Sequence, residues 1–190
     1  MENKTIYLDN CTYNRPFDDQ SQLRISLETQ AKLYIQSLIR DNKIDLVYSY
    51  VCFYENFINP FEDKKLSISN FSEYAKYSVI ENHDILVKAN EIIHKRIKPL
   101  DALHLSCAIN ADVDYFITVD DGILRYNTNE IKIPAAERRR IFVLPENCTA
   151  GLIPSVTPQS GGVLNPTARI KIFDPPMFIK FLDSQEGEID

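Results

Sequence analysis

The sequence predicts an α/β fold, a three-layer sandwich in which helices cover both faces of a mainly parallel central sheet. Short apolar segments rich in β-favouring residues, at 4–9, 44–49 and 115–119, alternate with longer segments of helical periodicity. This alternation is typical of parallel sheets, whose strands need a crossover helix between them. The chain of 190 residues has only 5 glycines, which argues against a sandwich or barrel with many tight turns.

The helices are predicted from apolar spacing and from the prolines beside them. Pro60 ends one helix because the residue before a proline avoids helical angles, and Pro99 suits a first helical turn, where its missing N–H is not needed. Residues 10–19 are polar, contain Pro16 and are predicted to form a loop. The predicted helices are 20–41, 50–58, 84–96 and 99–111, with one or two more within 61–78.

Composition excludes several classes of protein. A hydrophobic share of 44% suits a globular core, and a domain of this size buries roughly 70% of its unfolded surface. The chain shows no signal peptide and no apolar run near the ~18 residues of a membrane span, so we expect a cytoplasmic protein without membrane contact. Four cysteines form no C-x-x-C pair and are expected to be reduced, packed thiols: Cys11, Cys52, Cys107 and Cys148.

Acidic residues stand where predicted strands end or helices begin. Asp9 ends the first strand and Asp120 follows the third, while Asp101 begins a helix and Glu55 lies in the helix after the second strand. In open parallel sheets, ligands bind outside the carboxyl ends of the strands. We therefore expect these four carboxylates to reach one edge of the sheet.

Four clustered carboxylates indicate a metal site. Two of them ~4 Å apart repel by about 4 kcal/mol at an effective dielectric of about 20, so either protons or cations must compensate. Oxygen ligands favour Mg²⁺ or Mn²⁺, and such ions bind phosphodiesters and activate water. A carboxylate metal site also explains part of the net charge of −6, which is otherwise unfavourable for a nucleic-acid enzyme. Taken singly, Asp9 and Asp120 are better explained as helix caps or turn residues, Asp101 is explained by helix capping, and Glu55 by a solvated helix position.

Four motifs in this order resemble the PIN-domain family, which includes the VapC-like toxin ribonucleases. They are YLDN (7–10), the Ser49-to-Glu55 spacing, DALHLSCA (101–108) and YFITVDDGIL (115–124). The resemblance implies a metal-dependent endoribonuclease that hydrolyses RNA phosphodiester bonds, with Mg²⁺ or Mn²⁺ as cofactor. It further implies the toxin of a toxin–antitoxin pair, with an antitoxin protein as partner, and a homodimer. Its catalytic and metal-binding residues fall on Asp9, Glu55, Asp101 and Asp120.

Other residues are weaker candidates. The resemblance gives Asn10 and Thr118 as accessory positions, and Asp121 is either a further ligand or a helix cap. His104, one turn after Asp101, either contacts the phosphate or packs behind the site. Arg15 is a candidate for RNA binding, although a surface arginine is an equal explanation. Five aromatic residues are interpreted as packing the core or a dimer face rather than stacking on bases: Tyr48, Tyr50, Phe53, Tyr54 and Phe57.

The end of the chain is interpreted as an interrupted domain. Residues 1–133 form the PIN-like nuclease domain and 170–182 complete it, because IFDPPMFIKFL resembles the family's closing strand and turn, with Asp174 in place of its usual Asn. Between them, 134–169 is rich in Pro, Gly, Ser and Thr, contains a basic run at 137–140 and is expected to be a flexible insertion with one short strand at 141–144. Residues 183–190 are an acidic tail.

Two other functions compete with the ribonuclease. A catalytically idle PIN domain would serve as a binding or assembly module, and metal titration distinguishes it from the enzyme. A metal-dependent phosphatase of similar architecture would carry D-x-D-x-T after the first strand, and this chain does not.

Overall fold

The computed structural model describes residues 3–125, 142–143 and 171–186. In chain order its elements are β1 (Lys4–Leu8), α1 (Asn10–Asn14), the 3-10 helix η1 (Arg15–Phe17), α2 (Leu23–Arg40), β2 (Ile44–Ser49), α3 (Tyr50–Phe57), α4 (Glu62–Ser72), β3 (Ala75–Val79), α5 (His83–Ile93), α6 (Pro99–Asn110), β4 (Tyr115–Ile117), α7 (Asp121–Leu124), β5 (Phe142–Val143), β6 (Lys171–Phe173) and α8 (Pro175–Glu186). This alternation of strands and helices confirms the predicted α/β class.

The sheet has β1 near its centre. Its strand order is β5-β3-β2-β1-β4-β6, and all neighbouring pairs run parallel except β3 with the short edge strand β5. Ile6 of β1 pairs with Leu46 on one side and with Tyr115 on the other. The chain therefore builds the sheet outward from β1 in both directions. A crevice suited to ligands is expected outside the carboxyl ends of the strands at such a switch point.

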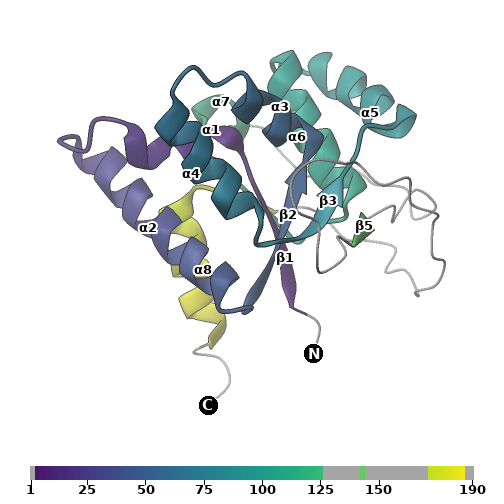
Figure 1. The fold of residues 1–190 in the computed structure, drawn as a ribbon. Helices are drawn as coiled ribbons and strands as arrows, with labels where there is room; N and C mark the ends of the chain where they lie inside the picture. The colour runs from purple at the N-terminus through teal and green to yellow at the C-terminus, as the bar shows by residue number, and fades with distance from the viewer. Residues whose placement is uncertain (1–2, 126–141, 144–170, 187–190) are drawn as a thin grey trace.

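Helices lie on both sides of the strands, as Figure 1 shows: α2 and α8 pair on one side, and α5 and α6 pair on the other. The core between these layers includes β1, where Ile6, Tyr7 and Leu8 are fully buried. Phe178 anchors α8 in the same core, with its ring centre 5.0 Å from that of Tyr115 on β4. The predicted three-layer sandwich with a mainly parallel sheet is confirmed.

Two predicted segments differ from the structure. Residues 10–19 are mostly helical rather than a loop, since α1 begins directly after Asp9 and η1 contains Pro16. Residues 61–78 contain α4 and then β3, a strand that the helical prediction missed. In β3 only Ala75 and Val79 are buried, so its sequence shows little of the alternation by which strands are recognised. The helix predicted at 20–41 begins at Leu23.

Predictions for the C-terminal third are described only in part. Of the proposed insertion at 134–169, the structure describes 142–143, which form β5 and pair with β3 within the predicted short strand. The rest of that segment, its basic run at 137–140, residues 131–133 and Cys148 lie outside the described residues. At 171–173 the closing strand is present as β6, and α8 then continues through Glu186 into the predicted acidic tail. No described helix is long and apolar enough to cross a membrane.

Candidate functional site

The carboxyl ends of β1 and β4 bring the first site residues together. Asp9 follows β1 directly, and its backbone N–H donates to the Ile117 carbonyl of β4 at 2.9 Å. Thr118 and Asp120 continue from β4, so they reach the same end of the sheet. On the other side of β1, β2 leads through Ser49 into α3, which carries Glu55. The predicted convergence at the strand ends is thus built into the parallel register.

Asp9 is held by two donors. Its carboxyl group is buried, and Oδ2 accepts from the Thr118 hydroxyl at 2.8 Å and from the Cys11 thiol at 3.0 Å. Asp9 is also the N-cap residue of α1, but its side chain makes no capping hydrogen bond. Helix capping therefore does not account for this carboxylate. Burial is the largest cause that raises the pKa of the Cys11 thiol, and Asp9 raises it further, so Cys11 stays a protonated donor.

His104 joins Asp9 to Glu55. Its Nε2 lies 2.6 Å from Glu55 Oε2 and 3.6 Å from Asp9 Oδ1, and the imidazole is 2% exposed. Burial by itself would lower the pKa of His104, but Asp9 and the bond to Glu55 help to raise it well above its usual value. Of the two roles weighed for His104, the structure shows one directly: it is packed behind the site and hydrogen-bonded to Glu55.

Behind His104 lies a buried polar network. The Tyr7 hydroxyl is 2.7 Å from His104 Nδ1 and 2.6 Å from Ser49 Oγ, and Tyr7 is fully buried. Ser49 Oγ also accepts from the Cys52 backbone N–H at 3.2 Å, which caps the N-terminus of α3. The polar chain from Ser49 to Glu55 therefore passes through Tyr7 and His104 without a bridging solvent molecule.

Asp101 lies where negative charge is incompletely compensated. Burial raises its pKa above the usual 3.8, and the nearby carboxylates of Asp120 and Asp9 raise it further. Lys98 and His104 act in the opposite direction but do not cancel the effect. Asp101 stands in the first turn of α6 and does not cap it. Its electrostatic environment thus places it with Asp9 and Asp120, as the strand-end argument predicted.

Asp120 has both a structural and an electrostatic role. Its Oδ1 caps the short helix α7, accepting from the backbone N–H groups of Gly122 at 2.6 Å and Ile123 at 3.2 Å. A Cβ atom at Gly122 would stand 2.7 Å from Oδ1, so a larger residue there would displace the capping carboxylate. The other oxygen, Oδ2, lies 3.7 Å from Lys98 Nζ. Capping therefore occupies one oxygen of Asp120 and leaves the second at the acidic site.

The donor chemistry fits a hard divalent cation, because Asp9, Glu55, Asp101 and Asp120 offer oxygen ligands only. The charges of Asp120 and Asp9 also add to burial in raising the pKa of Asp101. As the side chains lie, however, no group of three or more His, Cys, Asp or Glu residues in the described part of the chain is arranged to hold a metal ion. Glu55 is instead hydrogen-bonded to His104. The residues supply the ligands, but their arrangement is not a closed coordination sphere.

Of the other candidates, Thr118 belongs to the site through its bond to Asp9, whereas two charged residues have partners elsewhere. The Asp121 carboxylate is exposed and pairs with the Arg24 guanidinium at 2.7 Å, which lowers its pKa. Arg15 lies 2.8 Å from the buried Glu28 and 3.0 Å from Asp18, so its guanidinium is already engaged with carboxylates.

Asn10, at the first position of α1, has a buried amide oxygen without a hydrogen-bond partner among the described residues. Among the described residues the structure therefore keeps Asn10 next to Asp9 with its side-chain oxygen buried and unpaired.

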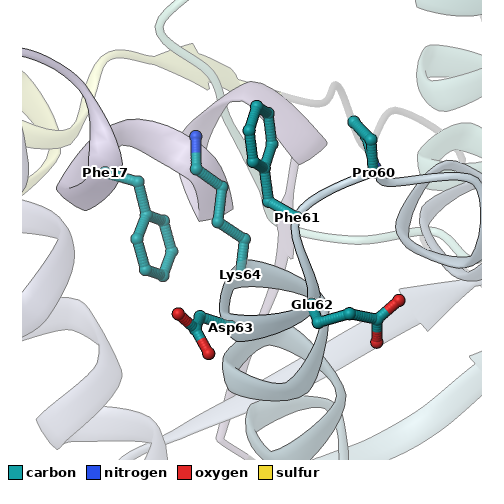
Figure 2. A pocket seen from close by; sticks show the side chains of 6 residues that line it. All are labelled: Phe17, Pro60, Phe61, Glu62, Asp63 and Lys64. Carbon is teal, nitrogen blue, oxygen red and sulfur yellow. The ribbon is translucent and has the colours of Figure 1, made fainter.

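The five aromatic residues do not all pack the core. Tyr48 is buried and Tyr50 partly buried, but Phe53, Tyr54 and Phe57 are more than half exposed on α3. A hollow of about 440 Å³ adjoins α4 (Figure 2); it is lined by Phe17, Pro60, Phe61, Glu62, Asp63 and Lys64. The Lys64 ammonium lies 4.7 Å from the Phe61 ring centre. No residue of the acidic site lines this hollow, so it is a separate surface feature.

Tyr7 and Cys11 are site residues that the sequence interpretation missed. A signal for Tyr7 was present, since a tyrosine inside a fully buried strand must find a partner for its hydroxyl group. Nothing in the spacing of Cys11 distinguished it from the packed thiols Cys52 and Cys107, which are indeed buried.

The comparisons with known proteins add no family. No protein-family model, no curated protein and no solved structure matches the chain. The functional conclusions below therefore depend on the residues and their geometry, and on the motif resemblance given above.

Proposed function

We propose that the protein is a metal-dependent endoribonuclease of PIN type, which hydrolyses RNA phosphodiester bonds with Mg²⁺ or Mn²⁺. The observation that carries this proposal is the convergence of Asp9, Asp101 and Asp120 at one end of the sheet, where burial, and then the charges of Asp120 and Asp9, raise the pKa of Asp101. Glu55 joins them through His104. A structural carboxylate normally gains an arginine, a lysine or a helix cap, whereas at Asp101 burial and the acidic neighbours outweigh Lys98 and His104.

In this mechanism Asp9, Glu55, Asp101 and Asp120 would hold the divalent ion. When bound, such an ion supplies positive charge for the scissile phosphate and lowers the pKa of water. The chain's own contribution is orientation: Thr118 and Cys11 fix Asp9, while His104 fixes Glu55. Lys98, with its ammonium 3.7 Å from Asp120 and largely exposed, is available to attract the phosphate backbone.

The biological setting is proposed from the motif resemblance. We infer a cytoplasmic toxin restrained by an antitoxin protein, acting as a homodimer on RNA. The exposed aromatic side chains of α3, Phe53, Tyr54 and Phe57, support a protein interface in general, because large exposed apolar patches mark interaction sites.

An idle binding module is the second candidate. Its supporting observation is that no described group of three potential ligands is already arranged for a metal ion, with Glu55 bonded to His104 instead. The two candidates differ in what a divalent ion does to the folded protein.

Metal titration separates them. An ion that binds only the folded state stabilises it by mass action, by about 2.7 kcal/mol at 100 times its dissociation constant. For a chain of this length we expect Mn²⁺ to raise Tm by about 5–10 °C. Excess EDTA should abolish cleavage of single-stranded RNA while the circular dichroism spectrum stays folded. No rise in Tm together with no cleavage would favour the idle module, and cleavage that survives exhaustive chelation would contradict the metal mechanism.

A further inference from the structure

We propose that Tyr7 and Ser49 are positioning residues that hold the His104 imidazole with Nε2 toward Glu55 and Asp9, and so preset which carboxylate oxygens are left for a cation. The proposal rests on the proposed metal-dependent function and extends it to three residues that the acidic quartet does not include. It concerns the orientation of the His104 ring, and it rests on the short contacts that join Ser49, Tyr7, His104 and Glu55 in series.

The direction of the last contact follows from chemistry. An ionised Glu55 can only accept, so the hydrogen between it and His104 belongs to Nε2, at a separation of 2.6 Å. That leaves Nδ1 to face the Tyr7 hydroxyl at 2.7 Å, and the same hydroxyl faces Ser49 Oγ at 2.6 Å. Both ring nitrogens are therefore engaged, and a flipped imidazole would place a carbon atom against Glu55.

Packing removes the remaining freedom of this network. The Tyr7 ring stacks on Phe116 with centres 5.3 Å apart and planes inclined by 8°, and it meets the His104 ring edge-on at 5.9 Å. Tyr7, Ser49 and His104 are each at most 2% exposed. Since neighbouring side chains surround these groups, the hydrogen bonds among them set a single orientation.

A second buried tyrosine shows that this network is not required for burial itself. Tyr13 on α1 is 1% exposed, and its hydroxyl has no hydrogen-bond partner among the described residues. The core thus accommodates the Tyr13 hydroxyl without a network. The Tyr7 hydroxyl has three partners, Ser49, Cys52 and His104, and His104 leads on to Glu55. The difference between Tyr7 and Tyr13 points to a role for the Tyr7 hydroxyl at the site.

As a consequence, one oxygen of each of the two carboxylates is hydrogen-bonded to the protein and the other is left for a cation. Glu55 Oε2 is taken by His104, and Asp9 Oδ2 is taken by Thr118 and Cys11. Within the described residues, neither Glu55 Oε1 nor Asp9 Oδ1 accepts a hydrogen bond, and His104 Nε2 lies 3.6 Å from Asp9 Oδ1. Oriented carboxylates of this kind are typical of metal ligands supported by surrounding hydrogen bonds.

The test compares Tyr7→Phe with Tyr13→Phe, since each removes one buried hydroxyl and keeps the ring. In the metal-free protein, the ¹⁵N resonances of the His104 ring should shift in Tyr7→Phe and stay unchanged in Tyr13→Phe, with His83 and His94 as internal references. By calorimetry, Tyr7→Phe should weaken Mn²⁺ binding by about 10- to 100-fold, the usual effect of removing a partner behind a ligand. Tyr13→Phe should bind Mn²⁺ as the wild type does.

Two further pairs keep the proposal falsifiable if Tyr7→Phe fails to fold. His104→Gln retains an N–H donor for Glu55 and should keep more of the Mn²⁺ affinity than His104→Leu. Ser49→Thr keeps the hydroxyl and should leave the His104 resonances in place, whereas Ser49→Ala should move them. Unchanged His104 resonances and unchanged Mn²⁺ affinity in Tyr7→Phe, or equal affinity in both His104 variants, would overturn the proposal. The NMR result needs no RNA cleavage, so a failure of the ribonuclease proposal is recognised separately.

Discussion

Two halves of the acidic site hold their carboxylates in different ways. The inner half, Asp9 and Glu55, is bonded to protein donors: Thr118 and Cys11 for Asp9, and His104 for Glu55. The outer half is Asp101. This residue is half-buried, and its pKa is raised by burial and by the charges of Asp120 and Asp9.

The difference separates what the fold organises from what a ligand must complete. A buried carboxylate with donors in place is stable without a cation, whereas a carboxylate whose nearest charges are other carboxylates is destabilising until one arrives. The outer half is therefore where binding of a divalent ion gains most, and the inner half is where the ion's position is set.

Neutralising each half should change stability in opposite directions, and this is the largest expected effect. In EDTA at pH 7, Asp9→Asn should lower the free energy of unfolding by about 1–3 kcal/mol, because an amide N–H then faces the His104 donor. Asp101→Asn should instead raise it slightly, since it removes repulsion. Both variants should cleave RNA at least about 100-fold more slowly, a barrier increase of about 2.7 kcal/mol. Urea unfolding and a cleavage assay with Mn²⁺ measure the two effects.

The comparison fails if the two variants shift stability in the same direction. The sequence did not predict this difference, because it indicated only that Asp9 and Asp101 reach the same edge of the sheet. Only the structure shows that Asp9 has two donors and Asp101 mainly acidic neighbours.

This contrast shows where sequence reasoning succeeded and where it could not. The position of Asp9 and Asp120 follows from parallel strands ending at one edge, and the register of β1 with β4 confirms that placement. The network of Tyr7, Ser49 and His104 depends on the directions of side chains from three elements. The periodicity of strands and helices does not predict these directions. Strand β3 was missed for a related reason: its neighbours in the sheet, rather than its own pattern, determine its conformation.

The pH dependence of metal-free stability should reflect Asp101 with a definite sign. Its folded-state pKa lies above the usual 3.8, so between these two values the folded state binds more protons than the unfolded state. Stability must then fall as the pH rises through that interval. The difference between wild type and Asp101→Asn should accordingly be near zero below about pH 4 and grow to a plateau above the raised pKa. Thermal unfolding of both proteins in EDTA across this range measures it, and a difference that shrinks with rising pH would contradict the proposed electrostatics.

The smallest effect on stability is expected from substitutions of the adjacent residues Asp120 and Asp121. Comparing these two residues also tests where the metal site ends. Asparagine caps helices as well as aspartate does, so Asp120→Asn should keep its bonds to the α7 backbone and remove only the charge. Asp121 is exposed and pairs with Arg24, an arrangement that adds little to stability. We expect both variants to melt close to the wild type in EDTA. With Mn²⁺, Asp120→Asn should lose most of its gain in Tm and its cleavage, while Asp121→Asn should keep both. If Asp121→Asn lost metal binding instead, the site would extend to the exposed side of α7, and the ligand set would have to be drawn around Asp121 in place of Asp120.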